Sequence, residues 1–393
     1  MKKLIKTGLI LVLAIAMIVP TLLISITADQ SGTLTTYEAT ITNAKGGANA
    51  IATMTFDDGH PRTAEKLNEL LAKYDAKASL MLYCTKSLSN ATNINYWSAV
   101  ASGGYLAMES HSYTHDYLTS NPNNTPPERL NEEKYDYETA GARDKIRESI
   151  PGQEVLAMTI PYANYVADAR KHVIKNYYAA LAGECALTVS SHAGKIMSLD
   201  PTFADPSTGS TPAGSWHNVI YARLQPIYSD SVYPQLTMEN IIGYLDRCVE
   251  GKGWFITSCH GIYQGENQDL TEAQLIELLE AMNAYQKENK LWVTSFSEAT
   301  KYIRERQNSK AIVTTYGDGT YYVDVTMADT TADGLSLTGE ITMPDGTKSK
   351  IFDMPLTVKV ELPSNWSNVT YSQAGGEEST VATLLSLVRH TLT

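Results

Sequence analysis

Two adjacent carboxylates and a later pair of histidines are the residues of this chain whose types and spacing could do chemistry. Asp57-Asp58-Gly59 directly follows the apolar and β-branched run 51–56, which predicts a buried strand. Successive side chains of an extended segment point in opposite directions, so the two acids can serve different partners. Because adjacent carboxylates repel each other unless a cation or a proton separates them, this strand end predicts a cation site.

His111 and His115 are separated by three residues, a spacing that would place both imidazoles on one face of a helical turn. With one of the two aspartates they make a set of two imidazoles and one carboxylate. Such a set suits a divalent metal, with zinc as the first candidate and cobalt, nickel or iron as alternatives. It also leaves positions open for water and substrate, as catalytic sites do, and it frees the other aspartate to act as a base.

Thr55-Phe56-Asp57-Asp58-Gly59, followed by His111-Ser112-Tyr113-Thr114-His115, resembles the first two motifs of the polysaccharide deacetylases, the NodB-homology family of carbohydrate esterases. The resemblance extends over residues 48–303. It implies an α/β fold, a distorted (β/α) barrel of NodB-homology type, and metal-dependent removal of acetyl groups from sugars. It also implies the roles of the site residues, with Asp57 as general base and Asp58, His111 and His115 as metal ligands.

Two later stretches resemble further motifs of this family. His260, which follows the predicted strand 254–259, corresponds to the histidine that acts as general acid on the leaving group. Pro161-Tyr162 follows the predicted strand 155–160, and the backbone N–H of Tyr162 is the donor expected at the oxyanion. The implied reaction uses a metal-bound water as its nucleophile.

The sequence departs from the family pattern in two places. Thr159 and Ile160 stand where the third motif carries an arginine that holds the base, so no arginine is expected beside Asp57. The fourth motif, which tunes the acid histidine, has no clear match, and Asp230 and Trp216 are the candidates for it.

Strands and helices alternate through this region, which predicts a largely parallel α/β layout. The predicted strands are 51–56, 78–83, 105–108, 155–160, 254–259 and 291–293. The predicted helices include 128–150, 167–181, 237–249, a helix that begins at a capping box formed by Thr271 and Gln274, and a last helix that ends near Arg306.

The sequence divides into five parts. Residues 1–28 read as a signal peptide, because lysines precede the apolar run 9–26 and a small residue, Ala28, could mark the cut; an uncleaved membrane anchor is the alternative. Residues 29–48 form a leader with a peripheral strand, and 49–306 form the deacetylase-like domain. Residues 310–370 alternate as a small β-sandwich domain of immunoglobulin-like type, and 371–393 form a tail. Trp366 is a candidate sugar platform in this β domain, for which a packing or spacer role is the alternative.

The formal net charge of −12 argues against nucleic acid or anionic membranes as partners. The signal peptide predicts a secreted or cell-surface protein with no membrane partner after cleavage. Cys84, Cys185, Cys248 and Cys259 permit disulfides in an exported chain, although the sequence does not choose a pairing. Cys259 is more typical of a small buried hydrophobe than of a metal ligand or nucleophile.

We therefore expect an exported metal-dependent deacetylase that acts on N- or O-acetyl groups of an acetylated polysaccharide or oligosaccharide. Chitin-like polymers, peptidoglycan and xylan all fit this description, and the oligomeric state is left open. One alternative is a related metal-dependent amide hydrolase acting on small substrates, because the same barrel and metal set could serve either. Another is a sugar-binding protein with a vestigial site, which the absent arginine would fit.

Overall fold

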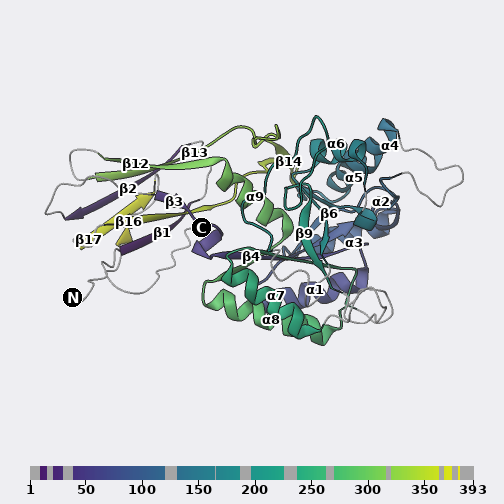
Figure 1. Cartoon of the computed structure of the whole chain (residues 1–393), viewed down its shortest axis with the longest axis horizontal. Helices are drawn as coiled ribbons and strands as arrows, with labels where there is room; N and C mark the ends of the chain where they lie inside the picture. Colours follow the sequence, from purple (N-terminus) through teal and green to yellow (C-terminus); the bar gives the residue numbers. More distant parts are fainter. Residues whose placement is uncertain are drawn as a thin grey trace, which may run out of the picture.

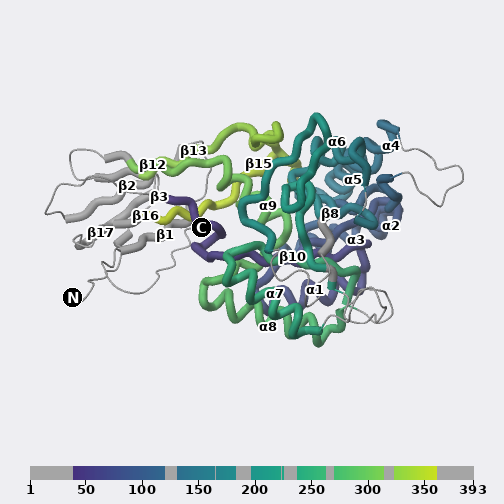
Figure 2. Tube along the Cα trace, viewed as in Figure 1, coloured from purple at the N-terminus to yellow at the C-terminus, as the bar shows by residue number. Residues whose placement is uncertain are grey.

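A computed structural model describes residues 9–15, 21–29, 39–119, 131–163, 165–185, 196–224, 237–262, 270–315, 320–362, 367–373 and 379–380. Figure 1 shows two parts side by side, a strand barrel wrapped in helices and a smaller region built from β-strands. The chain leaves the barrel through helix α9 (Phe296–Gln307) and enters the β region at strand β12 (Ser309–Thr315), as the coloured trace of Figure 2 shows.

Seven parallel strands form the barrel, and each pairs with its neighbour in chain order. The last strand pairs with the first and so closes the ring, with Phe255 opposite Ala52 and Cys259 opposite Phe56. The strands are β4 (Ala50–Phe56), β5 (Ala78–Leu82), β6 (Leu106–Ser110), β7 (Ala157–Thr159), β8 (Ala179–Cys185), β9 (Val219–Arg223) and β10 (Trp254–Cys259). This arrangement confirms the α/β barrel expected from the resemblance.

An eighth strand, β11 (Leu291–Val293), shares one edge of β4 with β5. Its Trp292 lies opposite Ile51 in the first half of β4, whereas β5 pairs with the second half, where Ser79 lies opposite Thr55. β11 therefore extends the sheet without entering the closed ring.

Alternation along each strand divides the apolar residues of the barrel into two cores. Ile51, Leu181 and Ile256 belong to the cluster in the barrel interior. Met54, on the opposite face of β4, belongs to the outer cluster, in which it is joined by Leu67 of helix α1 (Pro61–Tyr74). Because the strands are buried on both faces, they appear in the sequence as continuous apolar runs, and this is why most of them could be predicted.

Helices cover the outside of the ring (Figure 1). Thr271 and Gln274 exchange side-chain and backbone hydrogen bonds at the start of one of them, which confirms the predicted capping box. Besides α1 and α9, the longer helices are α3 (Ala91–Ala101), α5 (Ala142–Ser149), α6 (Ala167–Asn176), α7 (Met238–Glu250) and α8 (Glu272–Lys287).

The predicted helix 167–181 is correct up to residue 176 and wrong over its last five residues. α6 ends at Asn176, Tyr177 is extended, and the Ala-rich segment that follows is β8. Alanine favours helices, but here pairing with β7 on one side and β9 on the other outweighs that local preference. β9 itself has no counterpart among the predicted strands.

Two antiparallel sheets make up the β region. In the first, β16 (Leu356–Leu362) pairs with β1 (Leu9–Ile15) and with β3 (Ala39–Ile41), so segments from opposite ends of the chain lie side by side. The second has the order β12, β13 (Thr320–Met327), β2 (Thr21–Asp29), β17 (Ser367–Gln373) and β18 (Ser379–Thr380). Two sheets of this kind agree with a small β domain.

The backbone of the apolar amino-terminal segment pairs within these two sheets through β1 and β2. The removal of residues 1–28 as a signal peptide stays a prediction. Among the described residues, no helix is both long and apolar enough to cross a bilayer. The candidate sugar platform Trp366 lies outside the described residues.

A separate hairpin, β14 (Glu340–Thr342) and β15 (Lys348–Lys350), packs against the barrel and pairs with neither sheet. Ile341 and Phe352 pack with Leu156, which directly precedes β7. The Gly152 N–H donates to the Thr342 carbonyl at 3.2 Å. The hairpin therefore covers the amino-terminal end of the barrel, opposite the end at which the acids and histidines follow their strands.

Helix α9 supplies polar contacts to the same segment. The Arg304 guanidinium pairs with Asp333 at 3.0 Å, and both side chains are fully buried. The Met354 N–H donates to Glu305 Oε1 at 3.0 Å. Separating Arg304 from Asp333 would leave two charged groups buried without compensation, which is costly, so this pair holds the segment against the barrel.

We predict that Glu305 makes the protein less stable as the pH rises. Burial raises the pKa of Glu305 to about 8, well above the value of 4.5 expected when unfolded, although the Met354 N–H lowers it. The folded state therefore retains a proton that the unfolded state releases between these pKa values, and the free energy of unfolding falls over that range. Glu305→Gln should flatten this fall, as measured by chemical denaturation at about pH 5 and about pH 8. The control is Glu340→Gln, at an exposed position of the hairpin, and a Glu305 variant that follows the wild type at both pH values would contradict the prediction.

Candidate metal centre

The carboxyl-terminal ends of the parallel strands bring the predicted site residues to one edge of the barrel. In parallel barrels this edge is the one that carries functional sites, because side chains from several strands meet there. Asp57 and Asp58 follow β4, His111 follows β6, Tyr162 follows β7 and His260 follows β10.

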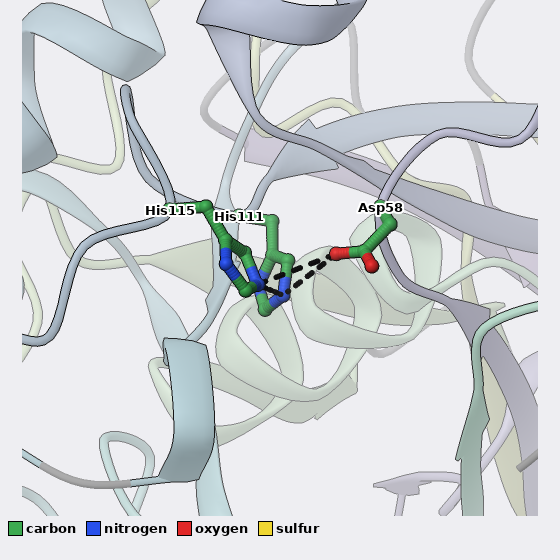
Figure 3. Close-up of side chains that lie close together, drawn as sticks. All are labelled: Asp58, His111 and His115. Atoms are coloured by element: carbon green, nitrogen blue, oxygen red, sulfur yellow. Dashed lines mark hydrogen bonds and ion pairs between the residues drawn. The ribbon is translucent and has the colours of Figure 1, made fainter. Parts of the chain in front are cut away.

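Asp58, His111 and His115 point their ligand atoms toward one another (Figure 3). The two Nε2 atoms of His111 and His115 are 3.1 Å apart. Asp58 Oδ1 lies 3.3 Å from Nε2 of His115 and 3.5 Å from Nε2 of His111. The structure therefore brings the three predicted ligands together.

The spacing of these atoms fits a divalent metal ion. Ligand bonds of about 2.1 Å place donor atoms about 3.0 Å apart at right angles and about 3.4 Å apart in a tetrahedron. The three separations fall close to this range. Two nitrogens and one carboxylate oxygen also form a donor set typical of zinc and related ions.

A second hydrogen bond orients the His111 ring. His111 is buried, and its Nδ1 lies 2.7 Å from the Thr159 carbonyl oxygen. Because a carbonyl can only accept, Nδ1 must carry the proton and Nε2 keeps its lone pair for a metal. Thr159 thus contributes through its backbone, a role independent of its side-chain type.

Both the acid and the second histidine are held in the protonation states that a metal requires. Burial and the neighbouring His111 lower the pKa of His115 to about 4, although Asp58 raises it, so His115 is neutral at pH 7. Burial raises the pKa of Asp58, but the histidines His111 and His115 outweigh that effect, and its pKa lies below the ordinary value. The site therefore offers one carboxylate and neutral imidazole.

The segment between the two histidines is not the predicted helical turn. The His111 N–H still pairs with the Leu82 carbonyl at 2.8 Å, as a continuation of the sheet. Ser112 and His115 have positive φ values of 70° and 67°, a conformation that costs residues with a Cβ of the order of 1–3 kcal/mol each. The imidazoles meet because the chain folds back sharply, with the His115 N–H donating to Ser112 Oγ at 2.9 Å.

The glycine of the Asp-Asp-Gly motif is required by space and backbone conformation. Gly59 has a φ of 59°, and a Cβ at this position would lie 2.6 Å from Ser87 Oγ and 2.8 Å from Leu82 Cδ2. Asp58 also has a positive φ, of 68°, which aspartate tolerates better than most residues. The turn after β4 therefore directs the Asp58 side chain toward the histidines, whereas the backbone of Asp57 still pairs with β10.

Asp57 is held by a residue to which the sequence analysis gave no role at the site. Its backbone N–H donates to the Cys259 carbonyl at 2.8 Å, and its Oδ2 accepts from Ser258 Oγ at 2.9 Å. Its other oxygen, Oδ1, is buried and accepts no hydrogen bond from the part of the chain that the structure describes. Ser258 could have been found by period-two alternation, which places it on the interior face of β10 with Ile256.

His260 follows β10, the strand that closes the ring on β4, and its side chain approaches the Asp58 carboxylate. Its Nε2 lies 3.8 Å from Asp58 Oδ2, and its side chain is partly exposed. A side chain with this placement can contact both the site and an incoming substrate, as the predicted general acid must.

Tyr162 presents its ring beside the metal ligands. It has a φ of 59° and is half exposed, and it stacks on Tyr117 with ring centroids 3.9 Å apart. Its centroid is 5.0 Å from that of His115. Pro161 precedes it and is buried in the one-turn helix η3 (Pro161–Ala163). Tyr117 was not among the predicted site residues.

Trp216 does not tune the acid histidine, contrary to one expectation from the sequence. It lies before β9, at the amino-terminal end of the barrel, and is fully buried. The Arg304 guanidinium lies 4.4 Å from its ring centroid, and its Nε1 donates to Gln307 at 3.0 Å. His260 follows the opposite end of its strand. The other candidate, Asp230, lies outside the described residues.

Three of the four cysteines, Cys84, Cys248 and Cys259, are buried and do not form a disulfide with one another. Cys259 lies on the outer face of β10 in the apolar cluster between strands and helices, in agreement with its interpretation as a small buried hydrophobe.

Residues 45–181 match the family model for polysaccharide deacetylases. The matched region contains Asp57, Asp58, His111, His115 and the Pro161-Tyr162 pair, and it ends before His260. The resemblance to this family, inferred above from two motifs, is confirmed by this match. Among curated proteins, none matches the chain.

Solved structures with a similar fold include carbohydrate esterases and a relative that is not an active enzyme. The Xyl-CE4 domain of a multidomain xylanase from the hindgut metagenome of Trinervitermes trinervoides is 17% identical, with 63% of this chain and 88% of that chain covered and a TM-score of 0.36. A family 4 carbohydrate esterase from Streptomyces lividans in complex with acetate is 15% identical, with 62% and 91% covered and a TM-score of 0.37. A CE4-family pseudoenzyme from Bacillus anthracis is 13% identical, with 64% and 65% covered and a TM-score of 0.38. At these low scores, the likenesses carry no conclusion about chemistry.

We predict that His111→Ala abolishes tight binding of zinc. Loss of an outer-shell hydrogen bond typically weakens metal affinity 10–100-fold, so loss of a ligand itself should weaken it by more than about 100-fold. The measurement is calorimetric titration of zinc into protein stripped with a chelator. His172→Ala is the control, because His172 is also largely buried but pairs with Glu132 and Asp136, which are not among the predicted metal ligands. Zinc binding by the His111 variant at wild-type affinity would place the metal elsewhere.

Proposed function

We propose that this chain is an exported, metal-dependent deacetylase that hydrolyses N- or O-acetyl groups on a polysaccharide. The observation that carries the proposal is the convergence of Asp58, His111 and His115 next to a second carboxylate. This cluster lies within the region that matches the polysaccharide deacetylase family. Export is proposed from the signal peptide predicted over residues 1–28.

The three ligand residues would hold a divalent ion, with zinc as the first candidate, that polarises an acetyl carbonyl and lowers the pKa of a water molecule. Asp57 would accept the proton of that water as general base. Ser258 occupies Oδ2 of Asp57, so Oδ1 is the oxygen left to accept the proton. The Thr159 carbonyl keeps the His111 ring oriented throughout.

Departure of the amine or alcohol requires a proton donor, and we assign this role to His260. It follows β10, the strand that pairs with β4, and its Nε2 is 3.8 Å from Asp58 Oδ2. The proposed base and acid thus follow two adjacent strands, β4 and β10. The backbone N–H of Tyr162 is proposed to stabilise the oxyanion, since Tyr162 follows β7 at the same edge.

The aromatic residues near the site favour a sugar polymer over a small amide. The Tyr162 ring is half exposed and lies against Tyr117 and beside His115. Exposed tyrosine rings offer a flat apolar face together with a hydroxyl group, a combination that suits contact with sugar rings.

A sugar-binding protein with a vestigial site is the second candidate, because Thr159 and Ile160 stand where the motif carries its arginine. Two features support an active site instead. Ser258 supplies a hydrogen bond to Asp57 without the arginine, and the ligand atoms of Asp58 and the histidines keep separations suited to a metal.

The test of the proposed function is acetate release by the purified full-length protein from acetylated chitin-like, peptidoglycan and xylan substrates. Acetate should appear with at least one glycan, disappear on addition of a chelator, and return with added zinc or cobalt. Zinc binding without acetate from any glycan would overturn the proposal and favour the binding protein or the small-amide hydrolase.

We predict that Asp57→Asn retains zinc but loses turnover. The amide cannot accept a proton from water, and loss of a general base typically costs about 10²–10⁴-fold in rate. Acetate release and zinc content are measured on the same preparation. Asp168→Asn on the exposed face of α6 is the control and should keep its activity. An Asp57 variant that remains active would remove Asp57 from its assigned role.

A further inference from the structure

The loop that carries His115 needs support from outside itself. Its Ser112 and His115 have left-handed backbone conformations, which a short loop does not adopt without external contacts. Within the loop, one hydrogen bond from the His115 N–H to Ser112 Oγ is formed. That bond leaves the N–H groups of Tyr113 and Thr114 to be satisfied elsewhere.

The carboxylate of Glu138 satisfies both of them. Its Oε2 accepts from the Tyr113 N–H at 3.0 Å and from the Thr114 N–H at 2.9 Å. Its Oε1 accepts from Thr114 Oγ1 at 2.6 Å and lies 2.8 Å from the Lys134 ammonium. The Glu138 side chain is fully buried, so its charge is compensated entirely by these donors.

Glu138 belongs to a π-helical turn, η2 (Tyr137–Gly141), between α4 (Glu132–Asp136) and α5. Such turns insert an extra residue into a helix and occur frequently at functional sites. The turn is itself anchored, because the Tyr177 hydroxyl donates to the Thr139 carbonyl at 2.8 Å. The Tyr137 ring also lies against Tyr113 of the histidine loop, with centroids 4.1 Å apart. The Glu138 side chain therefore extends from an anchored turn to the loop that carries His115.

We propose that Glu138 is a positioning residue for the metal ligand His115. By accepting from two successive backbone N–H groups and from the Thr114 hydroxyl, it holds the loop in the conformation that brings Nε2 of His115 to 3.1 Å from Nε2 of His111. This inference deepens the proposed function and rests on the same metal site. Glu138 contacts neither the ligand atoms nor a substrate, so it acts through the loop.

The carboxylate is required because each of its oxygens serves two donors. In Glu138→Gln, one oxygen is replaced by an NH₂ group, which would face either the two backbone N–H groups or the Thr114 hydroxyl and Lys134. In the first case the N–H groups of Tyr113 and Thr114 lose their acceptor. In the second case the NH₂ group, a donor, faces the ammonium of Lys134, which is also a donor. Both arrangements loosen the loop while the volume of the side chain is kept.

The experiment compares zinc affinities by calorimetric titration into chelator-stripped protein. Glu138→Gln should bind zinc about tenfold more weakly than the wild type, as expected for loss of an outer-shell contact. The matched control is Glu305→Gln, the same change at another buried carboxyl group that accepts a backbone N–H far from the site, and it should bind zinc as the wild type does. Wild-type zinc affinity in a folded Glu138→Gln protein would overturn the inference.

Thr114→Val decides the question if Glu138→Gln does not fold. It removes only the hydroxyl hydrogen bond to Glu138 Oε1, at nearly constant volume, and should weaken zinc binding by about threefold or more, as expected for loss of one hydrogen bond. Unchanged affinity in this variant would overturn the inference. Because zinc affinity is measured without substrate, absence of acetate release by the wild type would remove the proposed function and leave the role of Glu138 intact.

Discussion

The parallel pairing of β4 with β10 is the constraint on which the site depends. It joins the first and last strands of the ring, so Asp57 and Ser258, which are 201 positions apart in the sequence, share a hydrogen bond. The same pairing places Asp58 and His260 next to each other. Because all seven strands run in one direction, closure of the ring also brings the ends of β6 and β7 to this edge.

Closure alone would bring the side chains together without giving them the protonation states needed for chemistry. Burial keeps His115 neutral, and the carbonyl of Thr159 keeps the His111 proton on Nδ1. Nearby imidazoles keep the pKa of Asp58 low despite its burial. Burial makes an isolated charge energetically unfavourable. It also leaves two nitrogen lone pairs and one carboxylate facing a common point, where a bound cation would compensate the buried negative charge.

Much of the site could be predicted because its signals are local. An apolar run that ends in two acids and a glycine is read within a few residues, and so is the pair His111 and His115. The turn between the histidines was predicted wrongly, because neither Ser112 nor His115 signals a left-handed backbone. The contacts that accompany this conformation, from the His111 N–H to β5 and from Glu138 to the loop, join segments that are distant in the sequence.

Other parts of the site depend on contacts that no local pattern reveals. Glu138 faces Thr114 across 24 positions of sequence, and its burial follows from the packing of the π-helical turn. Trp216 was misplaced because β9 was not predicted, so its position before that strand could not be known. Ser258 is different, since strict alternation along the predicted strand 254–259 would have placed it inside the barrel.

The hairpin that covers the amino-terminal end of the barrel has a consequence for how this protein could have been assembled. The chain passes from the barrel to β12 and β13, returns to the barrel with β14 and β15, and goes back to the β region with β16. A recombination event after α9 would separate Arg304 from Asp333 and Glu305 from Met354. Barrel and β region are therefore interleaved and would be inherited as one unit, unlike domains joined by a single linker that can be exchanged freely.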